Sequence, residues 1–286
     1  MELLIQLLNG IQYGLLLFLL ASGLTLIFGI MGVINLAHGS FYMIGAYLAW
    51  WLAEWTGSLW LALPIGLLLC FVLGAALERG LFARLYRRDH LDQVLLSFGL
   101  ILILEELRSL AFGDEVQGVA TPALLSASIP LTENLSYPVY RLFVSAVCLL
   151  VAGGLYWVIQ RTRLGMKIRA GNSNREMAQS LGIHIDRLYT LVFAAGVALA
   201  ALSGLLAAPM NSVYPGMGGS VLIVCFVVVV IGGIGSVKGA LIGALLIGLV
   251  DTFGKVLLPQ LAGALVYLLM AAILVWRPNG LYGRSA

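Results

Sequence analysis

Three polar side chains with chemical capacity, Asn35, His38 and Ser40, lie close together within residues 3–53, a run that contains no Asp, Glu, Lys or Arg. Asn35 and His38 are about one helical turn apart, so together they can offer hydrogen bonds to a passing solute. His38 and Ser40 would be the base and nucleophile of an enzyme, but residues two apart point to different helical faces and no third group is evident. The cluster therefore favours solute contact over catalysis, and we expect no catalytic residue.

The cluster lies in a glycine-containing interruption, residues 29–40, of an otherwise apolar run. As continuous helix, residues 3–53 would measure roughly 75 Å, enough to cross a bilayer core about 30 Å thick twice. Gly, Asn and His break such a helix and expose backbone N–H and C=O groups, which lipid cannot satisfy. The break persists only where protein packs around it or a watery path runs past it. We predict that Asn35 and His38 line a translocation path; the alternative is that His38 is a hydrogen-bonded packing residue.

The composition is that of an integral membrane protein, because 61% of the 286 residues are hydrophobic, 10% are charged and the mean hydropathy is +1.03. Soluble domains carry about 25% charged residues, so a soluble core is excluded. Further runs without charged residues are 55–77, 142–160, 188–237 and 256–276. We predict an all-α polytopic helical bundle, a single transmembrane domain over residues 1–286, with about nine spans (roughly eight to ten) and one or two broken helices.

Basic residues fall into three groups that the expected span count puts on one side of the membrane. The groups are Arg79, Arg84, Arg87 and Arg88; Arg161, Arg163, Lys167, Arg169, Arg175 and Arg187; and Lys238, Arg277 and Arg284. By the positive-inside rule this side is the cytoplasm, so we expect the loop 161–187 and the C-terminus inside, and the loop 113–139 and the N-terminus outside. Both loops are too short for a catalytic domain. We expect the basic residues to set the topology in the lipid membrane rather than to bind nucleic acid.

The three cysteines, Cys70, Cys148 and Cys225, lie far apart in apolar runs, and no histidine is near them. This spacing fits neither a disulfide framework nor a metal site. We therefore expect no metal and no cofactor.

The loop 161–187 contains a predicted short helix. Ser173, followed three residues later by Glu176, is typical of a capping box, and Gly182 suits the position after a helix C-terminus. The helix between them, about eight residues or about 12 Å long, is too short to cross a bilayer and is marginal in water alone. Its apolar residues on one predicted face are Met177, Ala178 and Leu181. This face needs a partner, which is either the membrane surface or the chain's own bundle, or else a cytoplasmic subunit.

Five segments match motifs of a known family, in the family's order and across nearly the whole chain. They are Gly32-Val-Ile-Asn35-Leu-Ala-His38-Gly39, Thr162-Arg-Leu-Gly-Met-Lys-Ile-Arg-Ala170, Ser180-Leu-Gly-Ile183, Gly232-Gly-Ile-Gly-Ser236 and Arg277-Pro-Asn-Gly-Leu-Tyr-Gly283. On these residues the chain resembles the permease subunit of a bacterial ABC importer of the branched-chain amino-acid type. It departs from the family's pattern at Leu36 and Tyr282, where Phe is more usual, and at residues 172–174, where acidic residues are common.

The resemblance implies that this chain forms half of a translocation pathway, beside two breaks in its helices. The pathway residues would be Gly32, Asn35, His38 and Gly39 in the first break and Gly232, Gly233, Gly235 and Ser236 in the second. The resemblance also implies a cytoplasmic ATPase-coupling helix over residues 174–182. Its contact residues would be Asn174, Arg175, Glu176, Met177, Ala178, Leu181 and Gly182.

The same resemblance implies the partners and location of the chain. The partners are a second permease subunit (related but different), cytoplasmic ATP-binding subunits and an external or periplasmic solute-binding protein, and the location is the bacterial inner membrane. The sequence agrees that ATP is hydrolysed on another chain, because it contains no G-x-x-x-x-G-K-[ST] motif and the nearest stretch, residues 232–238, has the wrong spacing. The expected cargo is a small branched-chain amino acid (Leu, Ile or Val).

Two alternatives stay open from the sequence. The same type of importer could carry amides, urea or aromatic acids, because a permease without its binding protein does not fix the cargo. An ion-coupled secondary transporter would share the broken helices but would need acidic residues near the middle of the membrane. The charged residues within the spans, Glu105 with Arg108 and Asp251 with Lys255, instead have the spacing of structural ion pairs.

We predict that His38→Ala and Asn35→Ala each reduce solute uptake into vesicles that contain the assembled transporter, because each change removes a polar contact from the path. Assembly should be retained and is checked by co-purification. Wild-type uptake by both variants would refute the role of these residues in the path.

Overall fold

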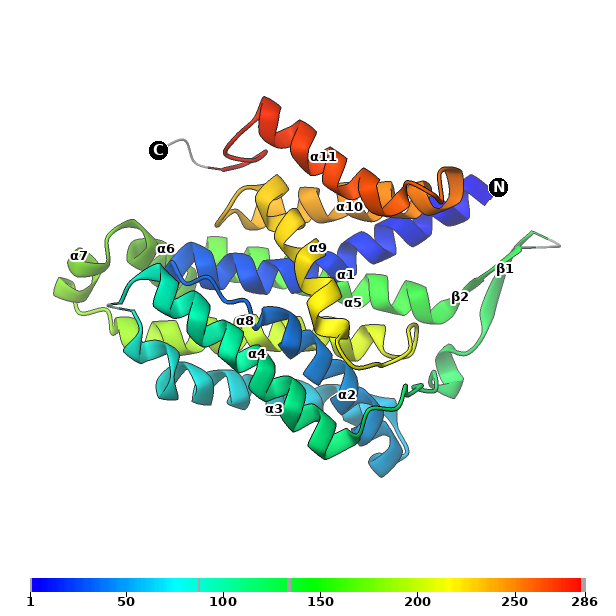
Figure 1. Cartoon of the computed structure of the whole chain (residues 1–286), viewed down its shortest axis with the longest axis horizontal. Helices are drawn as coiled ribbons and strands as arrows, with labels where there is room; N and C mark the ends of the chain where they lie inside the picture. The colour runs from blue at the N-terminus through cyan, green and yellow to red at the C-terminus, as the bar shows by residue number, and fades with distance from the viewer. Residues whose placement is uncertain (1, 87, 133–134, 284–286) are drawn as a thin grey trace.

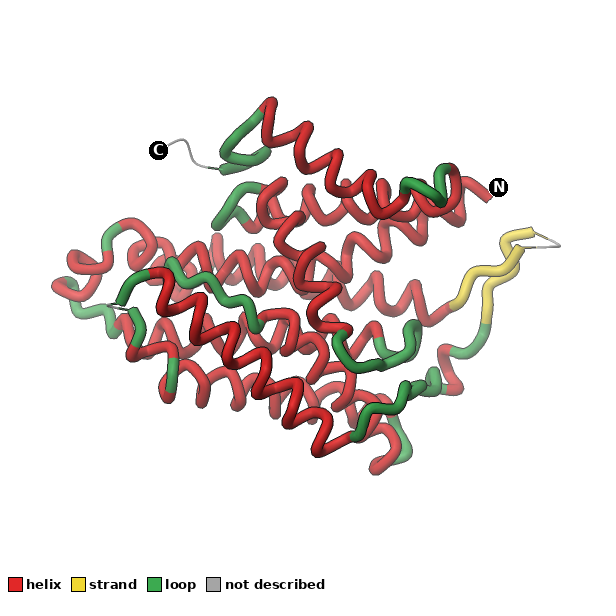
Figure 2. Tube along the Cα trace, viewed as in Figure 1, coloured by secondary structure: helices red, strands yellow, loops and turns green. Residues whose placement is uncertain are grey.

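Helices make up nearly all of the structure, a computed structural model that describes residues 2–86, 88–132 and 135–283 (Figure 1). The helices are α1 (Glu2–Met31), α2 (His38–Thr56), α3 (Leu59–Gly80), α4 (His90–Phe112), α5 (Val139–Arg161), α6 (Arg163–Ser173), α7 (Arg175–Ser180), α8 (Ile185–Ala207), α9 (Met217–Gly232), α10 (Val237–Leu257) and α11 (Ala262–Trp276). The smaller elements are the 3₁₀ turns η1 (Phe82–Arg84) and η2 (Ala123–Leu125) and the paired antiparallel strands β1 (Ser128–Thr132) and β2 (Leu135–Pro138). Most connections between the helices are short loops (Figure 2).

The length and composition of the helices fit a membrane bundle. Among the described residues five helices are long and apolar enough to cross a membrane, namely α1, α3, α5, α8 and α10. Helices α9 and α11 are shorter and apolar, and α2 and α4 have 19 and 23 residues. Together these are nine helices of 15 residues or more in the described part of the chain, five of which are long and apolar enough to span a membrane by themselves. The predicted all-α polytopic bundle is confirmed.

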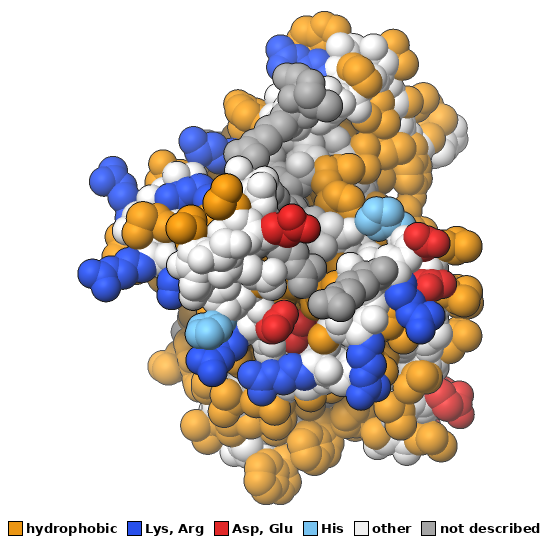
Figure 3. All heavy atoms as spheres, turned by 90° about the vertical axis from the view of Figure 1, so that its left-hand side faces the viewer, with side chains coloured by type: hydrophobic (Ala, Val, Ile, Leu, Met, Phe, Trp, Pro, Cys, Tyr) orange, Lys and Arg blue, Asp and Glu red, His pale blue; other side chains and the backbone are white. Residues whose placement is uncertain are grey.

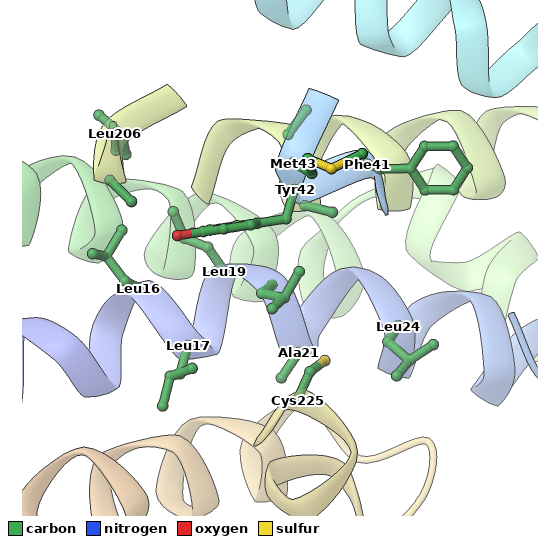
Figure 4. Close-up of a cluster of buried hydrophobic side chains, with 14 of the residues drawn as sticks. Leu16, Leu17, Leu19, Ala21, Leu24, Phe41, Tyr42, Met43, Leu206 and Cys225 are labelled. Carbon is green, nitrogen blue, oxygen red and sulfur yellow. The ribbon is translucent and has the colours of Figure 1, made fainter. Parts of the chain in front are cut away.

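Helix α1 lies at the centre of the bundle. It contacts α5, α8, α9 and α10, and most of its apolar side chains are buried. A helix that is hydrophobic on all sides needs cover all round, and here other helices supply it. Leu16, Leu19 and Leu24 of α1 belong to one buried cluster with Phe41 and Tyr42 of α2 (Figure 4). Helix α2 itself packs against α3, α8 and α9, and its buried side chains reach the same cluster as those of α1.

Two helices, α2 and α9, begin in the interior of the bundle. His38 and Gly39 at the start of α2 are buried, as are Met217 and Gly218 at the start of α9. The two starts touch, because a Cβ atom at Gly39 would overlap the carbonyl oxygen of Gly218. Backbones approach this closely only where side chains are absent. The break that the sequence predicts in residues 29–40 therefore exists. The start of α2, which follows the break, rests on the start of α9.

Helices α2 and α8 cross at equally close range. A Cβ atom at Gly204 of α8 would overlap the carbonyl oxygen of Tyr42, and one at Gly45 of α2 would overlap that of Ala201. Small residues at helix crossings allow the close van der Waals packing on which membrane bundles depend.

The two ends of the bundle differ in charge. One end is formed by α6, α7 and the starts of α4, α8 and α10, and exposed Lys and Arg side chains gather there (Figure 3); we call it the basic end. The strand pair and the start of α1 lie at the other end, which we call the strand end (Figure 1). The described members of the three basic groups thus share one end, in agreement with the prediction that the groups share one side of the membrane; Arg87 and Arg284 lie outside the described residues.

The loop 161–187 is more helical than predicted. Residues 163–173 form α6, which was not expected from the sequence because Gly165 and Gly171 have low helix propensity. The Oγ1 atom of Thr162 accepts a hydrogen bond from the Gly165 N–H (3.2 Å) and caps this helix. The chain can therefore reverse direction sharply after α5.

The predicted capping box of Ser173 and Glu176 is wrong. Ser173 is the last residue of α6, and Asn174 is the N-cap of α7, since its Oδ1 atom accepts a hydrogen bond from the Met177 N–H (2.9 Å). Glu176 therefore occupies the second helical position, one short of the position that a capping box requires.

The predicted C-terminus of this short helix is confirmed. Gly182 has a φ of +81°, and its N–H donates to the Gln179 carbonyl oxygen (2.9 Å). The Ile183 N–H donates to the Ala178 carbonyl oxygen (3.1 Å). These two bonds form the Schellman arrangement that ends many helices at a glycine.

The strand end also holds unexpected structure. Within the loop 113–139, β1 pairs with β2, and Gln117 forms an isolated bridge with Val213 in the connection between α8 and α9. That connection ends at Gly216, and α9 begins at Met217 although Gly218 and Gly219 follow directly. Buried contacts of Met217 and Gly218 compensate for the low helix propensity of glycine.

We predict that Gly204→Ala destabilises the protein by about 1–3 kcal/mol, because the added methyl group forces α8 away from α2. Gly99→Ala in α4 is the matched control, since a Cβ atom at Gly99 meets nothing within 4 Å; it should be neutral or stabilising by up to about 1 kcal/mol. The measurement is the denaturation midpoint of the purified protein in detergent. Equal midpoints for the two variants would contradict the close crossing.

Candidate translocation site

The first break is held by the two polar residues that the sequence singles out. Residues 32–37 are not helical, and Gly32 has a φ of +66°. The Asn35 Oδ1 atom accepts a hydrogen bond from the Ala37 N–H (3.1 Å). The His38 Nε2 atom lies 2.9 Å from the Leu20 carbonyl oxygen of α1, and because a carbonyl can only accept, Nε2 carries the proton. Asn35 thus stabilises the turn within the broken segment, and His38 fastens the end of the segment to α1.

Asn35 and His38 are fully buried, with 0% of each residue exposed. The Asn35 Nδ2 and His38 Nδ1 atoms have no hydrogen-bond partner among the described residues. Among the described residues, neither Asn35 nor His38 lines the cavities of about 560, 430 and 790 Å³. The packing role that the sequence left open for His38 is therefore observed in this conformation, and the lining of a path by both residues stays a prediction.

The second break joins α9 to α10. Gly233 and Gly235 have φ values of +94° and +79°. The Ser236 Oγ atom accepts a hydrogen bond from the Gly239 N–H (3.1 Å) and caps α10. A Cβ atom at Gly29 of α1 would come within 2.8 Å of the Gly235 Cα atom. The second break thus packs directly on the last turns of α1, next to the first.

The tail after α11 completes the second break. The Leu281 N–H donates to the Ile231 carbonyl oxygen (2.8 Å), and the Tyr282 N–H donates to the Gly232 carbonyl oxygen (3.0 Å). These carbonyl groups belong to the last turn of α9 and have no partner within the helix. The motif Arg277-Pro-Asn-Gly-Leu-Tyr-Gly283 therefore caps the end of α9.

A cavity of about 560 Å³ opens at the basic end, between α1, α5, α6 and the start of α10. Of the predicted pathway residues, Gly235 and Ser236 line it, together with Thr25, Arg169 and Lys238. The predicted residues that do not line it are Gly32, Asn35, His38, Gly39, Gly232 and Gly233. The structure thus brings two of the predicted residues to a cavity and buries or separates the others.

A second cavity, of about 790 Å³, lies at the strand end, between the first half of α1 and parts of α2, α8, α9 and α10. Its charged lining residues are Arg141, Asp251 and Lys255. None of these was predicted as a site residue, although Gln12 and Tyr13, which also line the cavity, are a polar interruption in an apolar span. Helix α1 separates the two cavities, since Phe18 lines one and its neighbour Leu17 the other.

The charged pairs expected from sequence spacing are present. The Arg108 Nη2 atom lies 3.5 Å from Glu105 Oε2, and the Lys255 Nζ atom lies 2.6 Å from Asp251 Oδ2. Arg108 also donates to Asp114 at the strand end (2.7 Å), and this hydrogen bond lowers the pKa of the Asp114 carboxyl. Arg108 is thereby fixed between two carboxylates, which lowers the cost of a buried cation.

The short helix α7 points its apolar side chains in two directions. Ala178 is buried against Ile185 and Leu188 of α8, whereas Met177 and Leu181 are 60% and 75% exposed. The prediction of one common apolar face is therefore wrong for Ala178. Arg175 begins α7, and its side chain lies outside the described part of the structure.

Within the described residues, no group of three or more His, Cys, Asp or Glu side chains is placed to hold a metal ion. Cys70, Cys148 and Cys225 are free and buried.

Interior helix starts, broken segments capped by side chains, and a cavity at each end define a polytopic helical membrane protein of the permease class. The chain belongs to the family described as branched-chain amino acid transport system / permease component, which it matches over residues 6–275. Because this is a family of transport subunits, the chain is a transport subunit and not itself an enzyme. No solved structure matches it.

Curated relatives agree with this family. The chain is 33% identical to the high-affinity branched-chain amino acid transport system permease protein BraD of Pseudomonas aeruginosa, over 98% of this chain and 95% of that protein. It is 30% identical to the permease protein LivH of Escherichia coli, with the same coverage. It is 28% identical to a second Escherichia coli permease, LivM, over 92% of this chain and 67% of that protein.

We predict that Ser236→Ala destabilises the protein by about 1 kcal/mol, because α10 loses its N-cap, whereas Ser236→Asn retains stability because Asn also caps helices. The denaturation midpoint of each purified variant gives the comparison. If Asn destabilises as much as Ala, the hydroxyl of Ser236 does not act as a cap.

Proposed function

We propose that this permease forms half of the translocation pathway of an ATP-binding-cassette importer for branched-chain amino acids. The observation that carries the proposal is similarity over nearly the full length to BraD and LivH, which are named as branched-chain amino acid permeases. Two cavities lined by apolar side chains and a few polar groups fit small amphiphilic solutes such as Leu, Ile and Val.

The proposal includes a second, different permease subunit, ATP-binding subunits and an external solute-binding protein. Similarity to both LivH and LivM supports an assembly of two related permeases. The sequence has no phosphate-binding loop of its own, which is consistent with ATP hydrolysis on separate subunits.

In this proposal the basic end faces the cytoplasm of a bacterial cell and the chain lies in the inner membrane. Lys and Arg gather at this end (Figure 3), as the positive-inside rule requires of a cytoplasmic side. Helix α11 runs from the strand end to the basic end (Figure 1), so the C-terminal tail would be inside.

Helix α7 is the proposed contact for an ATP-binding subunit. It lies at the basic end, Ala178 anchors it to α8, and Met177 and Leu181 project outward. Exposed apolar side chains on a rigidly capped turn are suited to a protein partner. Movement of that partner would reach α8 through Ala178, and through α8 the crossing with α2.

Solute would enter from the strand-end cavity and leave through the basic-end cavity. The partly buried break of residues 32–37 connects the end of α1 to the start of α2, which touches α9. In the proposal it allows α2 and α9 to shift relative to α1. Asn35 and His38 then act by holding the first broken segment, and Gly32 and Gly39 allow its close packing. At the second break, near the basic end, Ser236 caps α10, and the glycines Gly232, Gly233 and Gly235 allow the close packing.

The test of the function is uptake by the reconstituted complex. Vesicles that contain this chain, the second permease, the ATP-binding subunits and the binding protein should import labelled Leu, Ile or Val only with ATP. Unlabelled amides, urea and aromatic acids, added in excess, should compete weakly. Import by the chain alone, or import of an amide or urea in preference to Leu, would overturn the proposal.

We predict that Leu181→Ala weakens association with the ATP-binding subunit roughly fivefold or more, as truncation of an interface anchor does. Leu91→Ala in α4 is the matched control, because Leu91 is also 75% exposed and lies at the same end. Co-purification and coupled ATP hydrolysis are measured for both variants. A complex that is as intact with Leu181→Ala as with Leu91→Ala would argue against docking through α7.

A further inference from the structure

The strand-end cavity carries charges that the packing of the bundle does not require. Its three charged residues come from two helices, Arg141 from the first turn of α5 and Asp251 and Lys255 from α10. In a membrane protein, charged side chains that face a cavity are costly and mark functional sites. A solute site is therefore the first possibility to examine for this cavity.

Arg141 is a cation without a carboxylate of its own in the described structure. Its Nη1 atom donates to the Asn9 Oδ1 atom of α1 (2.5 Å), a neutral partner. No described Asp or Glu lies within ion-pair distance of it. The Tyr137 hydroxyl is a second neutral partner of the Arg141 side chain. These two partners fix the guanidinium at the cavity wall, and its remaining N–H groups are available to a further acceptor.

Asp251 supplies the opposite charge. Its side chain is only 16% exposed, whereas its partner Lys255 is 63% exposed on a long flexible stem. The Lys255 Nζ atom also lies 5.7 Å from the centre of the Tyr13 ring. An incoming ammonium group can therefore replace Lys255 at the Asp251 carboxylate, and Lys255 can then turn toward an anion in the cavity.

The floor of the cavity is apolar. Leu16, Leu17 and Leu20 of α1 line it. Tyr42 of α2 also lines it, and its side chain extends along the side of α1 that carries Leu16 and Leu19 (Figure 4). The cavity thus combines one spare cation, one displaceable carboxylate and an apolar surface within about 790 Å³, a volume typical of small-molecule sites. These are the groups that recognise the carboxylate, the ammonium and the aliphatic side chain of an α-amino acid.

We propose that the strand-end cavity is a binding site for an aliphatic α-amino acid, in which Arg141 holds the carboxylate and Asp251 holds the ammonium group. The side chain of the amino acid rests on Leu16, Leu17 and Leu20. This inference rests on the proposed function for its cargo, and adds to it a solute site within the permease itself.

The experiment measures binding to the whole complex of permeases and ATP-binding subunits in lipid nanodiscs, without the solute-binding protein. Labelled L-leucine is displaced by L-leucine, by 4-methylpentanoate, which lacks the ammonium group, and by L-leucinamide, which lacks the carboxylate. The wild-type complex should bind L-leucine at least about tenfold more tightly than either analogue, as expected for one charge-assisted hydrogen bond.

Each variant that neutralises one of the two charges in the site should erase one of these two preferences. Asp251→Asn should make L-leucine and 4-methylpentanoate bind about equally while the preference over L-leucinamide persists. Arg141→Gln should erase the preference over L-leucinamide and keep the preference over 4-methylpentanoate. Arg141→Lys and Asp251→Glu keep the charges and should retain both preferences. Glu106→Gln, which neutralises an exposed acid of α4 outside the cavity, is the control and should change nothing.

A purely structural role of the Asp251–Lys255 pair predicts a different result. Asp251→Asn would then weaken all three ligands by the same factor or none of them, and either outcome overturns the proposal. Absence of saturable L-leucine binding to the wild-type complex overturns it as well. If the complete system still imports L-leucine in that case, the proposed function stands and only the site is refuted; if it does not, both fail.

Discussion

Inside a bilayer every backbone N–H and C=O group must find its partner within the protein, and the two breaks of this chain depend on that constraint. At the first break the Asn35 side chain supplies an acceptor to the Ala37 N–H, and His38 ties the segment to α1. At the second, a distant part of the chain supplies donors to the last carbonyl groups of α9. Both breaks must also be shielded from lipid by neighbouring helices, and close glycine contacts such as that of Gly39 with Gly218 allow the helices to pack tightly enough.

The same packing separates the two cavities. Helix α1 is in contact with α5, α6, α8, α9 and α10, and of its middle residues Phe18 lines the basic-end cavity and Leu17 the strand-end cavity. On the proposed route from the strand-end cavity to the basic-end cavity, a solute can pass only if α1 and its neighbours move relative to each other.

The sequence predicted correctly those features that neighbouring residues in the chain determine. Gly, Asn and His within an apolar run predicted the first break, Gly182 predicted the end of α7, and three- and four-residue spacing predicted the ion pairs. It failed where the cause lies elsewhere in the chain. Helix α6 was not predicted because it contains glycines, and its cap and its neighbours stabilise it. The strand-end cavity was not predicted because it brings together side chains as distant in sequence as Asn9 and Arg141. In helices that are apolar on every face, hydrophobic periodicity does not reveal which side meets which neighbour.

The bonds between residues 281–282 and the end of α9 have a consequence for how such permeases diverge. Gly280 lies so close to Gly233 that a Cβ atom at Gly280 would come within 2.6 Å of the Gly233 nitrogen. Substitutions in the tail are therefore tolerated only together with matching substitutions about fifty positions earlier in the chain. Among relatives these two segments should covary as a unit, and a chimera that exchanges the tail between two permeases must exchange the α9–α10 junction with it.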